Sequence, residues 1–575
     1  MKHKFLFILL FSLVLEGMVT TQAVAGDYVH QVNTLIGTKG TGLTSGYLYP
    51  GATYPYGMVQ FTPSYFSKRS GFVINQLSGG GCEHMGNFPT FPVKGKLKMS
   101  PDNILNYRIN VSEEKGHAGY YEAMVQEDIK AKLTVTERTG MASYEYPADQ
   151  QYGTIIIGGG ISATPIEQAA IVITAPNKCE GYAEGGNFCG LRTPYKVYFV
   201  AEFDTDAFET GTWKREELMP NTTFAEGEYS GVYFTFDVNK KKNIQYKIGV
   251  SYVSVENARE NLKAENAEWD FQKIQNQAEA KWNHYLGMIE VEGTNPDRTT
   301  QFYTHLYRSF IHPNVCSDVN GEYMGADFRV HKSRSKHYTS FSNWDTYRTQ
   351  IQLLSMLDPE VASDIVVSHQ LFAEQSGGSF PRWVMANIET GVMQGDPTPI
   401  LIANAYAFGA RNYDPKPIFK IMRKGAEEPG SKSQDVETRP GLKQYLDKGY
   451  YNASIQLEYT SADFAIGQFA LHAVGDEFAS YFHFARSWKN LYNSDTGWLQ
   501  SRNPDGSWKS LGEDFRESTY KNYFWMVPYD IAGLVEIIGG KEKAEKRLDE
   551  FFTRLDAGYN DAWFASGNEP SFHIP

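Results

Sequence analysis

The hydrophobic period of the sequence changes near residue 255, and this change limits the folds that the 575-residue chain can adopt. Before it, short runs alternate apolar and polar residues and are separated by turn residues, as at 130–137, 195–203 and 245–253. Such runs are typical of antiparallel strands with one buried face. We therefore expect an antiparallel β-sandwich over residues 26–255.

Apolar and aromatic residues then recur with helical spacing at Leu262, Trp269, Ile274, Ala278 and Trp282. This spacing predicts one long linker helix within residues 256–295. The boundary between the domains should lie on that helix.

After Asn295-Pro296-Asp297, which suits a helix start, the period stays helical to the end of the chain. The predicted helices cover residues 299–311, 346–357, 359–374, 399–410, 461–474, 477–493, 528–538 and 541–555. They alternate with long loops rich in Gly, Pro, Trp and Asp. Paired helices with such loops suit an (α/α)6 barrel over residues 296–575, so the expected class is α+β with two domains. No short repeat is present, which disfavours a repeat solenoid.

The first 25 residues have the features of a cleaved secretory signal. Lys2 and Lys4 precede an apolar run at 5–15, and Ala23-Val24-Ala25 has the small-x-small pattern that signal peptidases accept. A membrane anchor is less favoured, because Glu16 ends the run before the ~20 apolar residues that a spanning helix needs. No later segment is apolar enough to span a membrane, and we expect a secreted or periplasmic protein.

The charge balance of the chain excludes an ordinary nucleic-acid binder. Lys and Arg number 54 and Asp and Glu number 67, which gives 54 minus 67, or -13. Binding to a phosphate backbone needs clustered cations, and no basic run is present.

The four cysteines can form disulfides in an exported protein. Cys179 and Cys189 flank a Gly-rich loop, where a local bridge across a hairpin is possible. Cys82 and Cys316 are expected to be buried free thiols. No cysteine pair has the spacing of a zinc site with a partner His.

Acidic residues stand beside aromatics, glycines or prolines in the predicted loops of the helical half. They are Asp345, Glu389, Asp396, Glu517, Asp530 and Glu569. Glycosidic bond cleavage uses one carboxylic acid to protonate the leaving oxygen and a second carboxylate on the far side of the sugar. Asp345 and Asp530 also suit helix N-caps, so capping competes with carbohydrate chemistry at both positions. Gly and Pro near Glu389 and Glu569 indicate tight loops.

An ordered set of motifs resembles the calcium-dependent exo-α-mannosidases of glycoside hydrolase family 92. In the first half these are VNTLIGT at 32–38, YPGATYPYGMVQ at 49–60 and LSGGGC at 77–82. In the second half they are WDTYR at 344–348, PRW at 381–383, ETG at 389–391, LEY at 457–459 and NEPS at 568–571. The set is specific as a whole, although no single motif is.

The resemblance implies a β-sandwich packed on an (α/α)6 barrel, with the pocket between them. It implies removal of terminal α-linked mannose, with inversion, from mannose-containing oligosaccharides or glycoproteins. A Ca²⁺ ion would hold O2 and O3 of the mannose and favour a flattened transition state; the sequence does not identify its ligands.

The resemblance also assigns roles to particular residues. Glu569 would be the general acid, with its pKa raised by a poorly solvated pocket. Trp344 and Asp345 would face the terminal sugar, with Asp345 accepting hydrogen bonds from its hydroxyls. The further pocket residues would be Glu389, Glu458, Glu517 and Asp530.

The sequence also departs from the family. Family members continue past the NEPS motif into a segment that supplies the general base and the closing helices, whereas this sequence ends at Pro575. We therefore expect a truncated form with an incomplete barrel. The sequence also differs from the usual family residues at Tyr529, at Phe572 and at 516–520. We therefore do not assign the linkage of the substrate as α-1,2, α-1,3, α-1,4 or α-1,6.

Two alternatives to the mannosidase remain open. One is a catalytically silent carbohydrate-binding protein that keeps the pocket and lacks the base. The other is a different (α/α)6 sugar enzyme, such as a disaccharide phosphorylase, which would need clustered cations for phosphate.

Overall fold

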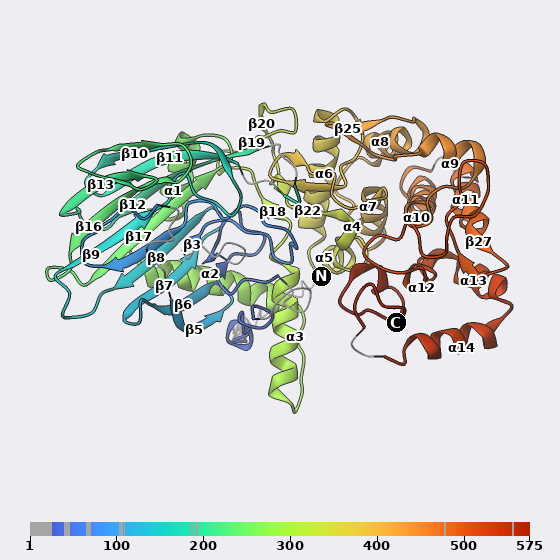
Figure 1. Ribbon diagram of the computed structural model, residues 1–575, viewed down its shortest axis with the longest axis horizontal. Helices are drawn as coiled ribbons and strands as arrows, with labels where there is room; N and C mark the ends of the chain where they lie inside the picture. The colour runs from blue at the N-terminus through green and yellow to red at the C-terminus, as the bar shows by residue number, and fades with distance from the viewer. Residues whose placement is uncertain are drawn as a thin grey trace, which may run out of the picture.

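The computed structural model describes residues 26–575 except 40–46, 65–70, 103–106, 108–109, 186–187, 191–193, 476–478 and 555–556. The predicted secretory signal at 1–25 lies outside the described residues. A domain of antiparallel sheets is followed by a helical domain, and the two lie side by side (Figure 1). The expected order of a β-rich and then a helical domain is confirmed.

Two large sheets form the N-terminal domain, and their neighbouring strands pair antiparallel. In spatial order, the eight-stranded sheet contains β1 (Ala52–Thr53), β2 (Gln60–Pro63), β3 (Phe72–Val73), β4 (Thr90–Lys94), β9 (Tyr152–Ile157), β16 (Ser230–Asp237), β13 (Glu209–Lys214) and β14 (Glu217–Pro220). The nine-stranded sheet contains β15 (Phe224–Glu226), β10 (Ile166–Ala175), β11 (Lys178–Gly185), β12 (Tyr195–Phe203), β17 (Asn243–Ser251), β8 (Thr139–Glu145), β7 (Ile129–Val135), β6 (Tyr120–Val125) and β5 (Val111–His117).

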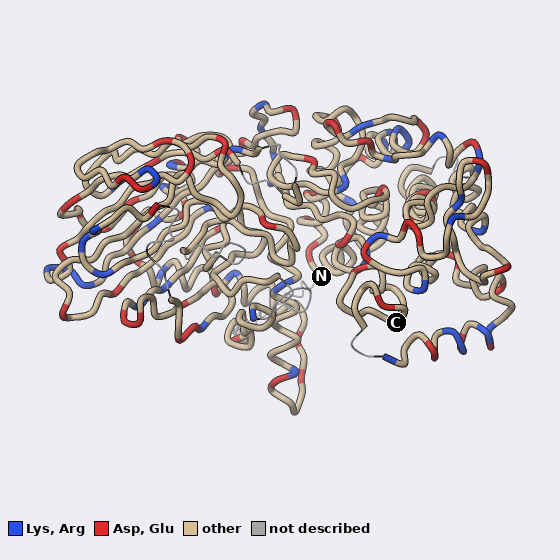
Figure 2. Tube along the Cα trace, in the orientation of Figure 1, with Lys and Arg blue, Asp and Glu red and all other residues tan. Residues whose placement is uncertain are grey.

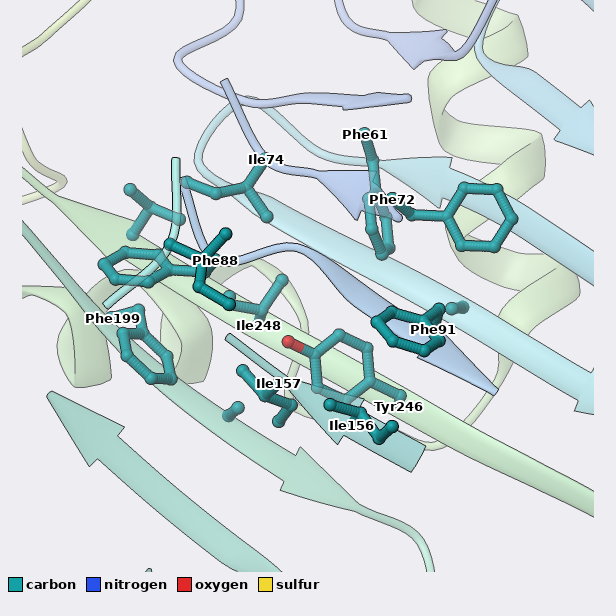
Figure 3. Packing of buried hydrophobic residues seen from close by; sticks show 14 of the residues in the cluster. Phe61, Phe72, Ile74, Phe88, Phe91, Ile156, Ile157, Phe199, Tyr246 and Ile248 are labelled. Carbon is teal, nitrogen blue, oxygen red and sulfur yellow. The ribbon is translucent and has the colours of Figure 1, made fainter. Parts of the chain in front are cut away.

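The inward faces of the two sheets share one aromatic and aliphatic core (Figure 3). Phe203 of the nine-stranded sheet and Phe234 of the eight-stranded sheet are both fully buried, with ring centroids 4.8 Å apart. Ile156 and Ile248 come from opposite sheets into the same cluster. Burial of such large side chains supplies most of the free energy that holds two sheets together.

The chain leaves the sandwich through two helices, so the prediction of a single linker helix is wrong. These are α1 (Val255–Glu265) and α2 (Phe271–Leu286). Between them Asn266 is buried, and its carbonyl and that of Ala267 accept hydrogen bonds from Lys247 on β17 at 3.0 and 3.1 Å. This turn lets both helices bury apolar residues on the nine-stranded sheet. Leu262 of α1 packs against Val200, and apolar residues of α2 pack against β8.

The C-terminal domain consists of helices joined by long loops and short hairpins. The helices are α3 (Pro296–Ser309), α4 (Asn343–Thr346), α5 (Gln350–Leu357), α6 (Pro359–Gln375), α7 (Pro397–Ala407), α8 (Pro415–Glu427), α9 (Leu442–Lys448), α10 (Ala453–Phe469), α11 (Ala479–Ala485), α12 (Tyr520–Tyr523), α13 (Ile531–Ile538) and α14 (Lys541–Phe551). The small strands are β18 (Asn314–Val315), β19 (Glu322–Met324), β20 (Val330–Lys332), β21 (Tyr338–Thr339), β22 (Phe341–Ser342), β23 (Trp383–Met385), β24 (Ile388–Glu389), β25 (Lys432–Ser433), β26 (Val436–Glu437), β27 (Tyr492–Asn493) and β28 (Trp498–Leu499).

Helix α10 shows why periodicity misjudges this domain. Asn452 caps it by accepting a hydrogen bond from the Ile455 N–H, so it begins eight residues before the predicted start at 461. Most of its residues are buried on every side, and a helix surrounded by others carries no amphipathic pattern. The earlier start places Glu458 inside the helix.

Acidic and basic residues are interspersed over both domains, and no basic stretch stands out (Figure 2). Among the described residues, no helix combines the length and the apolar character needed to cross a lipid bilayer.

Candidate active site

A pocket of about 540 Å³ lies at the junction of the two domains. The sandwich contributes loops at 47–48, 77–82 and 188–189, and the helical domain contributes residues from α4, from β23 and from the loops near 392 and 517. A third contribution comes from the end of the chain, at 567–569. Neither domain alone lines the pocket, because its lining residues come from both.

Three of the carboxylates expected from the sequence meet in this pocket: Asp345, Glu517 and Glu569. Asp345 lies on the short helix α4 and accepts a hydrogen bond from Ser342 Oγ. Glu517 has a left-handed backbone, with φ of 50°, and its carbonyl accepts a 2.6 Å hydrogen bond from Asn568 Nδ2. That bond holds the 517 loop beside Glu569.

Glu569 opens a 3-10 turn, Glu569–Ser571, that is fixed to α12. Ser571 Oγ donates to Asn522 Oδ1 at 2.6 Å, and Asn522 Nδ2 donates to the Trp563 carbonyl at 3.2 Å. Proline at the second position of the turn restricts its backbone further. The Glu569 side chain therefore projects into the pocket from a rigid support.

Burial and mutual repulsion favour the protonated forms of the pocket carboxyls. Burial, with the neighbouring Glu569 charge, raises the pKa of Asp345 to about 8. Burial also raises the pKa of Glu569, and Glu517 adds to this, while the Arg348 guanidinium opposes it. Two adjacent carboxyls with raised pKa values retain a proton toward neutral pH, as a general acid requires.

Glu458 and Trp344 lie behind the pocket wall and do not line it. Trp344 is fully buried, and its indole N–H donates to Glu458 Oε1 at 2.8 Å. Tyr347 OH and Arg348 Nη2 donate to the same carboxylate at 3.1 and 3.3 Å. The expected contacts of Trp344 and Glu458 with sugar are thus corrected: both fix α4 and hence Asp345.

Glu389 likewise organises the backbone and has no place on the pocket surface. Its carboxylate accepts hydrogen bonds from the backbone N–H groups of Arg382, Trp383 and Gly391. Burial raises its pKa, and the Arg382 guanidinium and these N–H groups oppose the rise. The sequence predicted a tight loop at Glu389, whereas the residue lies in strand β24, paired with β23, and its carboxylate binds the neighbouring backbone.

Asp530 is a helix cap, the alternative that the sequence left open. Its Oδ1 accepts a 3.0 Å hydrogen bond from Gly533 N in the first turn of α13, and its Oδ2 accepts a 3.1 Å bond from Trp488 Nε1. It does not line the pocket, so its expected role in sugar binding is corrected.

The disulfide joins Cys82 to Cys189, so the predicted pairing of Cys179 with Cys189 is wrong. Cys179 is a buried free thiol on β11, and Cys316 is free and buried as expected. The bridge ties the Gly-rich 77–82 loop to the tip beyond β11, and both of its cysteines line the pocket. Four cysteines allow three pairings, and sequence spacing does not choose among them.

Two histidines, one buried and one half-buried, also hold the 77–82 loop, and sequence inspection did not identify them. His84 Nε2 accepts a 2.8 Å hydrogen bond from Leu77 N, and His312 Nε2 accepts one of the same length from Ser78 N. Burial lowers the pKa of each to about 4, so both rings are neutral and able to accept.

The described residues of the pocket do not include the clustered cations that a phosphorylase would need. Arg308 is the sole Lys or Arg among the described lining residues, and its guanidinium donates to the carbonyls of Tyr49 and Thr34 at 3.0 and 2.7 Å. With three carboxylates around the same space, a bound phosphate dianion would be repelled.

Comparison with known proteins identifies the family. Residues 31–251 match the model of the glycosyl hydrolase family 92 N-terminal domain, and residues 257–575 match that of the family 92 catalytic domain. An uncharacterized secreted glycosidase of Arthroderma benhamiae is 25% identical over an alignment 653 positions long, which covers 98% of this chain and 78% of that protein.

Solved structures agree with this match. A family GH92 α-mannosidase of Bacteroides thetaiotaomicron superposes with a TM-score of 0.85 and 26% identity, covering 95% of this chain and 77% of its own. An inverting family GH92 mannosidase of the same organism, at 24% identity, shares the fold with a TM-score of 0.81 over 92% of this chain and 75% of its own. The protein therefore belongs to glycosyl hydrolase family 92, and it is a glycoside hydrolase.

Proposed function

We propose that this glycosidase is a secreted, exo-acting α-mannosidase that hydrolyses terminal α-linked mannose from oligosaccharides or glycoproteins with inversion. Family membership over both domains supports the substrate class, as does the likeness to a solved α-mannosidase at 26% identity. Export is supported by the features of residues 1–25 and by the relative described as secreted.

One observation carries the proposal: Glu569 projects into the two-domain pocket beside Asp345, and burial raises the pKa of both. Protonated Glu569 donates its proton to the glycosidic oxygen while the bond from that oxygen to the anomeric carbon breaks, and a water oxygen bonds to that carbon from the opposite face and gives up its proton to a base. Asp345, anchored by Ser342 and by the network around Glu458, accepts hydrogen bonds from hydroxyls of the terminal sugar.

Calcium forms part of the proposal, and the donor chemistry of the pocket fits it. The ion prefers several hard oxygen ligands, and the pocket offers carboxylate oxygens and loop carbonyls with no soft ligand required. Glu517 is the charged oxygen donor that would help to hold it. Bound calcium would supply Lewis-acid attraction for two vicinal hydroxyls of the mannose.

The test of Glu569 uses the dependence of the rate on the leaving group. Glu569→Gln should lower kcat on a mannobiose by about 10²–10⁴-fold, because a sugar alkoxide leaves poorly without protonation. With a dinitrophenyl α-mannoside the loss should be much smaller, since that group leaves without a proton. Equal losses on both substrates, or none, would remove Glu569 from the acid role.

Glu542→Gln on the exposed first turn of α14 is the matched control and should turn over both substrates like the wild type. Proton NMR of the first mannose released should show the β anomer if the reaction inverts. Chelation should stop turnover, and CaCl₂ but not MgCl₂ should restore it; activity that persists after exhaustive chelation contradicts the calcium part alone.

A further inference from the structure

A second polar cluster lies on the sandwich, away from the active-site pocket. His30 belongs to the 3-10 turn Val29–Gln31, His117 ends β5, and Glu279 is in the middle of α2. One potential ligand atom from each lies within 4.8 Å of the other two. Among the described residues, no other group of three His, Cys, Asp or Glu side chains comes together in this way.

Hydrogen bonds around the cluster fix its donor atoms. Asp27 Oδ1 lies 2.6 Å from His30 Nδ1, so Nδ1 is already engaged and Nε2 is the ring nitrogen that can face a ligand. Such carboxylate-histidine pairs are the usual outer support of a metal-bound imidazole. Gln275 Nε2 donates to Glu279 Oε1 at 2.7 Å, and His117 Nε2 lies 2.8 Å from the same oxygen.

The three chain segments are held together by contacts other than the cluster itself. Asn283 Oδ1 on α2 accepts hydrogen bonds from the N–H groups of Tyr28 and Val29 at 2.9 and 3.0 Å. Val29 is 1% exposed and packs in a core cluster with Trp282 of α2. The His30 and His117 rings are 4.6 Å apart. A ligand therefore meets donors that are already close.

We propose that His30, His117 and Glu279 bind a zinc ion, with Asp27 as the support of His30 and water in the remaining position. Two imidazoles and a carboxylate form a donor set typical of Zn²⁺. Ligand bonds of about 2.0–2.2 Å place tetrahedral donors roughly 3.3–3.6 Å apart, so donors separated by up to 4.8 Å must approach by about 1.5 Å, which a rotation of the exposed His30 side chain would supply. The ion joins the N-terminal segment, the β5–β6 hairpin and α2.

The test titrates ZnCl₂ into the full chain, produced without a polyhistidine tag, at pH 7.5 by calorimetry. One equivalent should bind, and the melting temperature should rise with zinc concentration. His117→Gln and Glu279→Gln should abolish this binding, and Asp27→Asn should weaken it about 10–100-fold. Cobalt should give the visible absorption of a tetrahedral site in the wild type and not in His117→Gln.

His331→Gln is the control, because His331 pairs with Asp327 at 2.9 Å in a His-carboxylate pair that belongs to no such cluster. It should bind zinc like the wild type. Absence of saturable binding, or equal binding by folded His117→Gln, overturns the proposal. Circular dichroism of each variant verifies folding, and none of these outcomes depends on mannosidase activity.

Discussion

At the scale of single residues, hydrogen bonding separates carboxylates that can do chemistry from those that build the site. Glu389 and Glu458 each accept three hydrogen bonds from the protein and do not line the pocket. Asp345 and Glu569 line the pocket, where a proton can bind to either carboxylate. All four occur in motifs of the same family, so motif membership alone does not distinguish the two roles.

The first prediction concerns the pH dependence of stability at Asp345. Its folded pKa of about 8 lies above the value of ~3.9 in an unfolded chain, so the folded state binds the proton more tightly. This contribution is fully present below pH ~4 and is lost as pH rises to about 8. Asp345→Asn removes it, so the melting temperature should fall less between pH 4 and pH 8 than in the wild type.

Asp549→Asn, an exposed change on α14, should keep the wild-type dependence on pH. A slope for Asp345→Asn that matches the wild type over the same range would mean that Asp345 is ionised throughout, and it would then be unsuited to share a proton with Glu569.

At the scale of elements, the sequence predicts the helices and strands that have a clear local periodicity. It misses the helix boundaries that depend on packing against residues distant in the sequence. The alternating runs at 195–203 and 245–253 are strands β12 and β17, because one face of each sheet points to the core. Helix α8 was missed although one face is strongly apolar, and α10 was started too late because it is buried all round. The break between α1 and α2 depends on Lys247 of β17, which lies outside any local window.

The second prediction concerns a buried ion triad that joins α7, α10 and the loop before α9. Arg439 is almost fully buried, and it donates to Asp396 at 2.8 Å and to Asp463 at 2.7 Å. Arg439→Met leaves two buried carboxylates without their cationic partner, so the helical domain should lose about 3–5 kcal/mol in urea denaturation.

Arg423→Met is the matched control, since Arg423 pairs with Glu427 one turn away on the exposed side of α8. The free energy of unfolding of Arg423→Met should be lower than that of the wild type by no more than about 1 kcal/mol. Similar costs for the two variants would show that the triad contributes no more than an ordinary surface pair.

At the scale of the whole molecule, the candidate active site is the pocket that residues of both domains line. The sandwich supplies the disulfide-linked wall, and the helical domain supplies the carboxylates. Phe188 of the sandwich and Trp383 of the helical domain are both buried, with ring centroids 4.5 Å apart, and both line the pocket. This aromatic contact couples the position of one wall to that of the other.

The third prediction is that this coupling appears in catalysis. Phe188→Leu and Trp383→Phe should each lower kcat/KM for a mannobiose, because each loosens one wall against the other. The double variant should lose less than the sum of the two, by about 0.5–1.5 kcal/mol, since the shared ring contact can be lost only once. Phe188→Leu combined with Phe551→Leu on α14, which lies far from the sandwich (Figure 1), should give additive losses. Additive losses for Phe188 and Trp383 as well would mean that the two domains shape the pocket independently.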